Sequence, residues 1–268
     1  MIDPRYGNLQ TLFADRVFRI PRYQRCYSWR QRQMNDLFSD VTVLAKNKSE
    51  DQHHFMATAV CHRTGETRAL GTAEYRVYDI VDGQQRLTTL IILLKCMELA
   101  LPLGSADRED LAKMLVKQDG HLILLQTNNV NAHIFNRFVR ESISPAEKEI
   151  RTHSDRNLTQ AINGRKTFVE GRKVSPDING LMRLVVHRLG FVVHDTGDSG
   201  VVYTLFEVLN SRGLGVDWLD KSKSVLMGKA HELCDSPTAA LADIGTLRAG
   251  CRVRPAPIGA ALHGGSAL

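Results

Sequence analysis

The sequence has 268 residues, of which 43% are hydrophobic and 24% are charged, and its formal net charge is +6 at pH 7. This composition supplies enough apolar side chains for the buried core of one large domain or two small ones. The longest apolar stretch, Leu87 to Leu101, contains Lys95 and Glu98 and is too short to cross a bilayer. No signal-peptide core follows Met1, so a cytoplasmic protein without a membrane partner is expected.

The cysteines argue against a disulfide framework or a zinc ribbon, because they are scattered, odd in number and never spaced as C-x-x-C. Cys61 and Cys96 lie in apolar patterns and are expected in the core, whereas Cys26 lies among polar residues and is a candidate for exposure. The sequence also lacks a G-x-x-x-x-G-K-[ST] phosphate loop and a G-x-S-x-G nucleophile elbow. It lacks an H-E-x-x-H motif as well, so no metal site is predicted.

Hydrophobic periodicity and turn residues predict helices and strands in alternation, followed by a mainly helical region. The expected elements are a short helix over 9–18, an extended segment around Pro21, a helix over 29–46, strands over 54–62 and 75–81, and a helix ending at Leu101. After these come helices over 106–117, 130–141, 146–156, 158–170 and 178–188, a strand over 190–194, and helices over 201–209 and 218–233.

The junction after the strand predicted over 75–81 has the densest polar pattern. Asp82-Gly83 favours a turn, and an apolar helical pattern continues from Leu87. A helix start has unpaired N–H groups and partial positive charge, so with Arg86 it makes a cradle for phosphate. An ordinary helix start with a solvated first turn explains the same residues equally well.

An earlier segment, from Ile20 to Trp29, alternates arginines with aromatic residues. Arginine binds phosphate, aromatic rings stack on bases, and glutamine hydrogen-bonds base edges. Aromatic side chains in the core beside solvated arginines are the alternative. The candidate DNA-binding residues are Arg22, Tyr23, Gln24, Arg25 and Trp29.

A third polar group ends the helix predicted over 201–209. Asn210 and Arg212 precede Gly213, which suits the left-handed residue that closes a helix, and Lys223 follows. Taken singly, these residues are ordinary caps and surface ion-pair partners.

In their order and spacing, the three blocks resemble the N-terminal domain of GmrSD-type modification-dependent restriction systems, a family long catalogued as a domain of unknown function. The blocks are Ile20-Pro21-x-Tyr23-Gln24-Arg25-x-Tyr27-x-Trp29, Ile80 to Leu90, and Phe206 to Gly213 with Asp220 and Lys223. The resemblance implies an α+β fold with a ParB-like or sulfiredoxin-like mixed core. The expected divisions are a nucleotide-binding core over 8–104, a mainly helical region over 105–234 and a poorly ordered tail over 235–268.

The resemblance also implies binding and hydrolysis of a nucleoside triphosphate with Mg²⁺, and sensing of DNA, including modified DNA, in anti-phage defence. Carried over to this chain, the expected catalytic residues are Asp82, Gln85 and Arg86. The expected nucleotide-binding residues are Gly83, Gln84, Arg86, Thr88, Asn210, Arg212 and Lys223.

The chain departs from the family pattern in two places. Lys221-Ser222 stands where a leucine-rich stretch is usual, and Ser224 replaces an amide residue; no H-N-H nuclease motif follows the third block. We therefore expect a DNA-sensing NTPase subunit that works with a separate nuclease and can form a homo-oligomer. A non-hydrolysing, nucleotide-gated DNA-binding adaptor and a degraded remnant are the alternatives.

Overall fold

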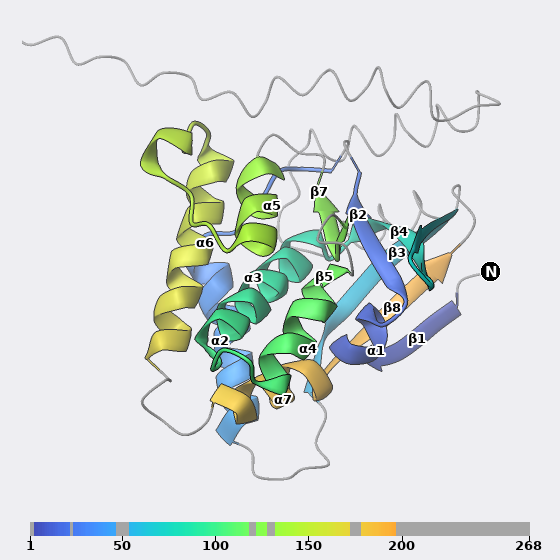
Figure 1. Cartoon of the computed structure of the whole chain (residues 1–268), viewed down its shortest axis with the longest axis horizontal. Coiled ribbons are helices and arrows are strands. Elements are labelled where there is room, and N and C mark those ends of the chain that lie inside the picture. Colours follow the sequence, from blue (N-terminus) through green and yellow to red (C-terminus); the bar gives the residue numbers. More distant parts are fainter. Residues whose placement is uncertain are drawn as a thin grey trace, which may run out of the picture.

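A six-stranded mixed sheet packed against helices forms the fold (Figure 1). The computed structural model describes residues 3–21, 24–46, 54–117, 122–127, 132–171 and 178–196. Its elements are β1 (Asp3–Asn8), α1 (Leu9–Phe13), β2 (Arg16–Ile20), α2 (Gln31–Lys46), β3 (His54–Leu70), β4 (Ala73–Asp82), α3 (Gln84–Ala100), α4 (Ala106–Leu115), β5 (Val116–Lys117), β6 (Leu122–Ile123), β7 (Leu125–Thr127), α5 (Ala132–Glu141), the 3₁₀ turn η1 (Glu147–Glu149), α6 (His153–Glu170), α7 (Ile178–His187) and β8 (Leu189–Thr196). This arrangement confirms the α+β class.

The strand order of the large sheet is β1-β8-β3-β4-β2-β7. Strand β2 runs parallel to both β4 and β7, whereas β3 runs antiparallel to β4. Strand β8 pairs parallel with β3 and antiparallel with β1. Since β4, β2 and β7 point the same way, their carboxyl ends lie at one edge of the sheet.

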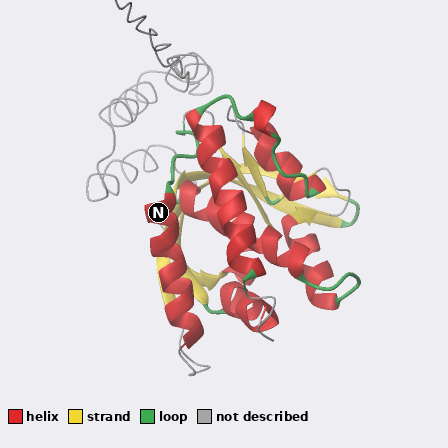
Figure 2. Cartoon of the chain, turned by 90° about the vertical axis from the view of Figure 1, so that its left-hand side faces the viewer, coloured by secondary structure: helices red, strands yellow, loops and turns green. Residues whose placement is uncertain are grey.

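Helix α3 is the centre of the core, and Figure 2 shows the helices packed in front of the sheet. All its residues from Leu87 to Glu98 are buried, which is typical of a helix that is covered on every side. The two charged residues in this stretch neutralise each other, because Lys95 Nζ lies 2.5 Å from Glu98 Oε2. The strand, turn and helix predicted over 75–101 are therefore confirmed.

The helix predicted over 9–18 is wrong in its second half. Helix α1 ends at Phe13, and β2 begins at Arg16. Val17 and Phe18 are buried, and β2 is hydrogen-bonded on both sides, by β4 and by β7. Pairing in the sheet outweighs the local helical preference of this segment.

The helix predicted over 146–156 is also wrong. The chain instead makes the short turn η1, and α6 begins at His153. A capping box fixes that start: the Thr152 side chain accepts from the N–H of Asp155, and the Asp155 carboxylate accepts from the N–H of Thr152 at 2.8 Å. This local signal sets the boundary.

Cys26 is buried, which corrects the expectation that it is exposed. Cys61 and Cys96 are buried as expected, and none of the three is part of a disulfide. The Cys26 carbonyl accepts a hydrogen bond from the buried Gln85 side chain, which ties this residue to the interior although its neighbour Arg25 is exposed.

Strands β7 and β8, from the later part of the chain, belong to the same sheet as the earlier strands. The division into domains stays a prediction. The helices predicted over 201–209 and 218–233 and the tail over 235–268 lie outside the described residues. In the part that is described, no helix is both long and apolar enough to cross a membrane.

Candidate functional site

The site lies at the edge of the sheet where three parallel strands end. Strand β4 ends at Asp82 and leads through Gly83 into α3, and β2 ends at Ile20 and leads into the basic aromatic segment. Strand β7 ends at Thr127, which is the register partner of Ile20. In α/β sheets, ligands bind in the crevice outside such carboxyl ends. The pairing of β2 with β4 thus brings together the first two polar blocks of the sequence, residues 20–29 and 80–90.

Gly83 shapes the start of α3. Its φ is +91°, in the left-handed region, and a Cβ added there would lie 3.4 Å from Ala59 Cβ. Its carbonyl accepts from Leu87 N at 2.9 Å, but it offers no side chain to cap the first turn. The N–H groups of that turn therefore have no side-chain cap from this residue, which favours an anion at this helix start.

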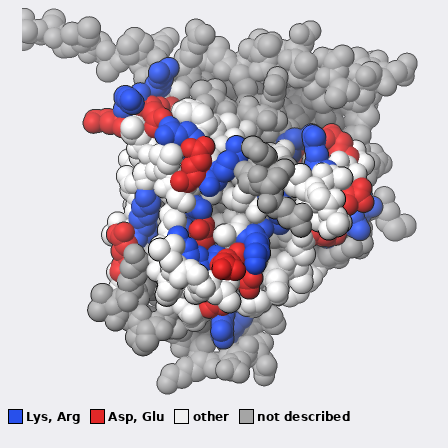
Figure 3. Space-filling view, viewed as in Figure 1, with Lys and Arg blue, Asp and Glu red and all other residues white. Residues whose placement is uncertain are grey.

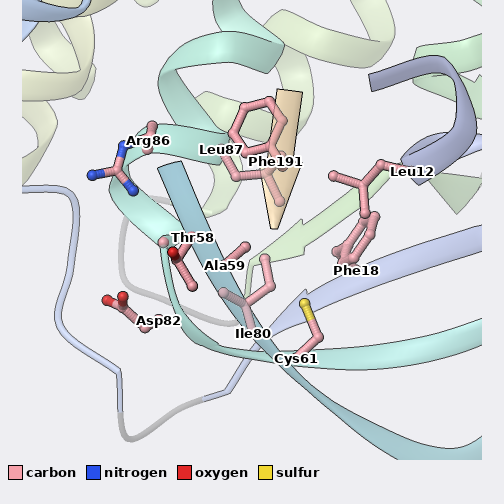
Figure 4. Close-up of a pocket in the computed structure, with 11 residues that line it drawn as sticks. Leu12, Phe18, Thr58, Ala59, Cys61, Ile80, Asp82, Arg86, Leu87 and Phe191 are labelled. Carbon is pink, nitrogen blue, oxygen red and sulfur yellow. The ribbon is translucent and has the colours of Figure 1, made fainter. Parts of the chain in front are cut away.

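Asp82 and Arg86 stand at one end of a small pocket beside this turn, and apolar side chains form its other end (Figure 4). Burial lowers the pKa of the Arg86 guanidinium, while the carboxylates of Asp82 and Asp40 oppose that shift. Among the residues the structure describes, the half-buried guanidinium makes no hydrogen bond or ion pair. The apolar lining consists of Leu12, Phe18, Ala59, Ile80, Leu87 and Phe191, with Thr58 and Cys61 beside them.

The Gln85 side chain joins α3 to the basic aromatic segment. Its Oε1 accepts from Ser28 N at 2.8 Å, and its Nε2 donates to the Cys26 carbonyl at 3.1 Å. The buried amide of Gln85 thus uses both of its ends on backbone groups. Its predicted role in orienting a water molecule stays a prediction, while its role in holding residues 26–28 is visible in the structure.

Three more hydrogen bonds fix the same segment. Gln24 Nε2 donates to the Val81 carbonyl at 2.8 Å, and Ser154 Oγ donates to the Tyr27 carbonyl at 2.8 Å. The Tyr27 hydroxyl lies 2.8 Å from Thr89 Oγ1, which itself donates to the Gln85 carbonyl, so Tyr27 is the donor. Burial raises the pKa of Tyr27 to about 12.

Gln84 and Thr88 lie on the other side of the α3 start from Arg86. Thr88 Oγ1 donates to the Gln84 carbonyl at 2.8 Å. The Gln84 side chain is only 6% exposed and lines a second small pocket. The residues that line this second pocket are Ile20, Arg25, Tyr27, Gln84, Gln85, Thr88, Thr127, Phe135 and Leu158.

The candidate DNA-binding residues separate into exposed and interior positions. Arg25 is exposed, Gln24 is buried, and Trp29 is partly buried against the core. Arg22 and Tyr23 lie outside the described residues. Contact of this set with DNA stays a prediction, and Arg25 is its described member with a side chain open to solvent.

Arginines of strand β2 do not add to a basic surface. Arg19 Nε donates to Asp79 Oδ1 at 2.6 Å, and the same guanidinium reaches Glu66 at 3.2 Å. These contacts raise the Arg19 pKa, the hydrogen bond to Asp79 being the main cause. On the face of the molecule drawn in Figure 3, basic and acidic side chains are interspersed.

Sequence reasoning overlooked Thr89 and Ser154, which hold the site together, and Thr127, which lines the second pocket. A threonine or serine gives no local sign of a distant neighbour, so only the tertiary structure identifies these residues. The candidates Asn210, Arg212 and Lys223 lie outside the described residues. Within the described ranges, no group of three His, Cys, Asp or Glu side chains is placed to hold a metal ion.

Comparison with known proteins gives one result. The sequence model of the family described as "GmrSD restriction endonuclease, N-terminal domain" matches residues 9–227, well over half of the chain. No curated protein matches the chain. The matched region contains all three polar blocks, so the resemblance drawn from those blocks is confirmed.

Proposed function

The chain belongs to the family of GmrSD restriction endonuclease N-terminal domains, and from this premise we propose that it binds and hydrolyses a nucleoside triphosphate at the start of α3. It is part of a GmrSD-type restriction system. One observation carries the nucleotide proposal: an uncapped, glycine-initiated helix start stands beside a half-buried arginine that makes no hydrogen bond or ion pair among the described residues.

The phosphates of the nucleotide would lie against the first turn of α3. Its backbone N–H groups supply donors, and the Arg86 guanidinium supplies a fixed positive charge. An anion would also offset the cost of burying Arg86, because a buried charge without a partner is unfavourable. The apolar end of the pocket excludes water and strengthens these interactions.

Asp82 is the residue that would hold Mg²⁺. One or two protein carboxylates with phosphate oxygens and waters suit this ion, so the single carboxylate beside Arg86 fits it. When bound, Mg²⁺ neutralises charge on the phosphates. Asp82 and Arg86 would then orient the triphosphate for in-line attack by water, a reaction that depends on positioning and charge more than on covalent chemistry.

The position of Gln85 favours a second candidate function, a nucleotide-gated adaptor that binds without hydrolysis. Both ends of the Gln85 amide hold residues 26–28, which makes it a link between the two blocks. Nucleotide at the α3 start would then change the basic aromatic segment through this link. Binding without turnover is the result that would favour the adaptor over the NTPase.

Calorimetry and a phosphate-release assay with Arg86→Ala test the proposal. A charged hydrogen bond contributes about 1.5–3 kcal/mol, so we expect about 10- to 100-fold weaker triphosphate binding, and turnover reduced at subsaturating nucleotide. Arg76→Ala is the matched control, because exposed Arg76 lies six residues before Asp82 on β4, about 20 Å away, and pairs with Asp15. Equal binding by Arg86→Ala and the wild type would reject the phosphate site.

DNA binding is the second part of the proposal and rests on the exposed Arg25. Binding to phosphates must weaken steeply with salt, and loss of one contact lowers the slope of log K against log salt by about one. We expect this change for Arg25→Ala and not for Arg183→Ala, an exposed arginine on α7. An unchanged slope for Arg25→Ala would exclude Arg25 from the DNA contact.

A further inference from the structure

We infer that the second pocket recognises a hydrogen-bond donor on the sugar or base of the same nucleotide, with Gln84 Oε1 and Thr127 Oγ1 as its acceptors. This inference rests on the proposed binding of a nucleoside triphosphate at the start of α3. It adds a specificity-determining subsite to the phosphate cradle and assigns a role to Thr127, which no sequence motif indicates.

Helix geometry separates the two pockets. Successive residues turn by about 100°, so Gln84 and Thr88 lie on one face, whereas Arg86 points about 160° away from both. The lining residues agree: Arg86 and Leu87 line the first pocket, and Gln84 and Thr88 line the second. A ligand with its phosphates on the helix start has a pocket on each side of it.

Gln84 is the first reason to expect a ligand in the second pocket. Gln84 is only 6% exposed, yet its Oε1 has no hydrogen-bond partner among the described residues. The neighbouring glutamine, Gln85, uses both ends of its amide. Buried polar atoms are nearly always paired, so an unpaired one at a pocket wall calls for a partner from outside the chain.

Thr127 is the second reason, and it is independent of the helix. Its Oγ1 is buried and also has no hydrogen-bond partner within the described part of the chain. It comes from the carboxyl end of β7, where it is held beside Ile20 by the sheet register. Two unpaired oxygens from separate elements therefore line one pocket.

The chemistry of the lining identifies the class of ligand group. An amide oxygen accepts only, and a hydroxyl can accept, so the complementary group is an O–H or N–H donor. Ile20, Phe135 and Leu158 supply apolar walls, and exposed Arg25 stands at the pocket with a positive charge. A ribose hydroxyl or a base amine, attached to an anionic nucleotide, meets all three conditions.

The experiment compares three probes by calorimetry with Mg²⁺: the four ribonucleoside triphosphates, the 2′-deoxy form of the tightest one, and inorganic tripolyphosphate. Gln84→Met removes the acceptor and keeps the bulk, and Thr127→Val removes the hydroxyl. We expect each variant to bind the tightest nucleotide about three- to tenfold more weakly and to bind tripolyphosphate as the wild type does. Gln160→Met, on the exposed face of α6, should change neither affinity.

The deoxy probe tests the 2′-hydroxyl as the donor. If the ribose 2′-hydroxyl is recognised, the variants and the wild type bind the deoxy form equally; if the 3′-hydroxyl or a base amine is recognised, the difference persists. Ligand-free Gln84→Met should melt no lower than the wild type, because it removes an unpaired buried oxygen. If Gln84→Met is instead misfolded, Thr127→Val gives the same comparison.

Two results would overturn the inference without touching the phosphate site. Nucleotide affinity that is unchanged in both variants would mean that the pocket holds only structural water. Equal losses for nucleotide and tripolyphosphate would mean that Gln84 and Thr127 merely support the helix start. By contrast, a wild type that binds none of the probes would contradict the proposed function itself.

Discussion

At the scale of single residues, Gly83 and Arg86 form the site for different reasons. Gly83 adopts a left-handed conformation in close contact with β3, so the chain can turn into α3 without a side chain over the helix start. Arg86 brings charge into a place where burial lowers its pKa. Gly83 thus leaves the backbone N–H donors accessible. Arg86 supplies the positive charge that favours binding of an anion there.

Gly83→Ala should lower the free energy of unfolding by about 1–2 kcal/mol, because a residue with a Cβ is strained at positive φ. It should also weaken triphosphate binding by moving the first turn of α3. Gly164→Ala is the control, since Gly164 lies within α6 with open space around it and should gain about 0.5–1 kcal/mol. Urea unfolding of both variants measures the difference; a Gly83→Ala protein as stable as the wild type would contradict the strain.

Lys117 gives a pH-dependent prediction. Its buried ammonium donates to the Phe13 carbonyl at 3.1 Å and lies 5.2 Å from the centre of the Tyr75 ring, and burial lowers its pKa to about 8. Between pH 8 and the unfolded value of about 10.4, the unfolded chain binds the extra proton, so the free energy of unfolding rises with pH.

The expected rise is on the order of 2–3 kcal/mol over that pH range, measured by urea unfolding at several pH values. Lys117→Met should remove this contribution, so its difference from the wild type shrinks as the pH rises from 8 to 10. Lys113→Met, at an exposed position of α4, should keep the wild-type dependence. Parallel curves for the wild type and Lys117→Met would refute the lowered pKa.

At the scale of elements, the segment from Gln24 to Ser28 and the start of α3 behave as one unit. The Gln85 side chain bonds to backbone groups of this segment, Gln24 bonds to the end of β4 just before α3, and Ser154 on α6 bonds to the segment as well. The basic aromatic segment therefore has no regular structure of its own but is held by side chains that bind its backbone. Movement of one element must move the other.

Gln85→Ala should release this segment. We expect faster hydrogen exchange at the Ser28 N–H and a loss of about 1–3 kcal/mol in the free energy of unfolding, because buried backbone groups lose their partners. Gln33→Ala is the comparison, since Gln33 accepts from the N–H of exposed Arg30 just before α2, away from the α3 start. Unchanged exchange at Ser28 would show that the remaining bonds hold the segment alone.

The sequence was informative where one local pattern dominates. Three neighbouring features could be predicted: the strand over 75–81, the Asp82-Gly83 turn and the apolar helix after it. Each has either a clear periodicity of hydrophobic residues or a residue that favours a turn. Strand β2 could not, since its pairing with β4 and β7 depends on distant residues. For the same reason Thr127 and Ser154 entered the site only through the fold.

At the scale of the whole molecule, one sheet edge collects three separate parts of the chain. Parallel pairing of β4, β2 and β7 places their carboxyl ends together, and the buried helix α3 fixes the first turn beside them. Acidic and basic side chains are mixed among the described residues on the face in Figure 3. The proposed nucleotide site lies at the sheet edge beside the start of α3.

A crystal structure with a non-hydrolysable nucleoside triphosphate and Mg²⁺ tests this central claim. The account predicts phosphate oxygens within hydrogen-bond distance of the first-turn N–H groups of α3 and of the Arg86 guanidinium, with Asp82 on the ion. It also predicts a sugar or base donor at Gln84. A triphosphate bound with its phosphates away from the start of α3 would contradict it.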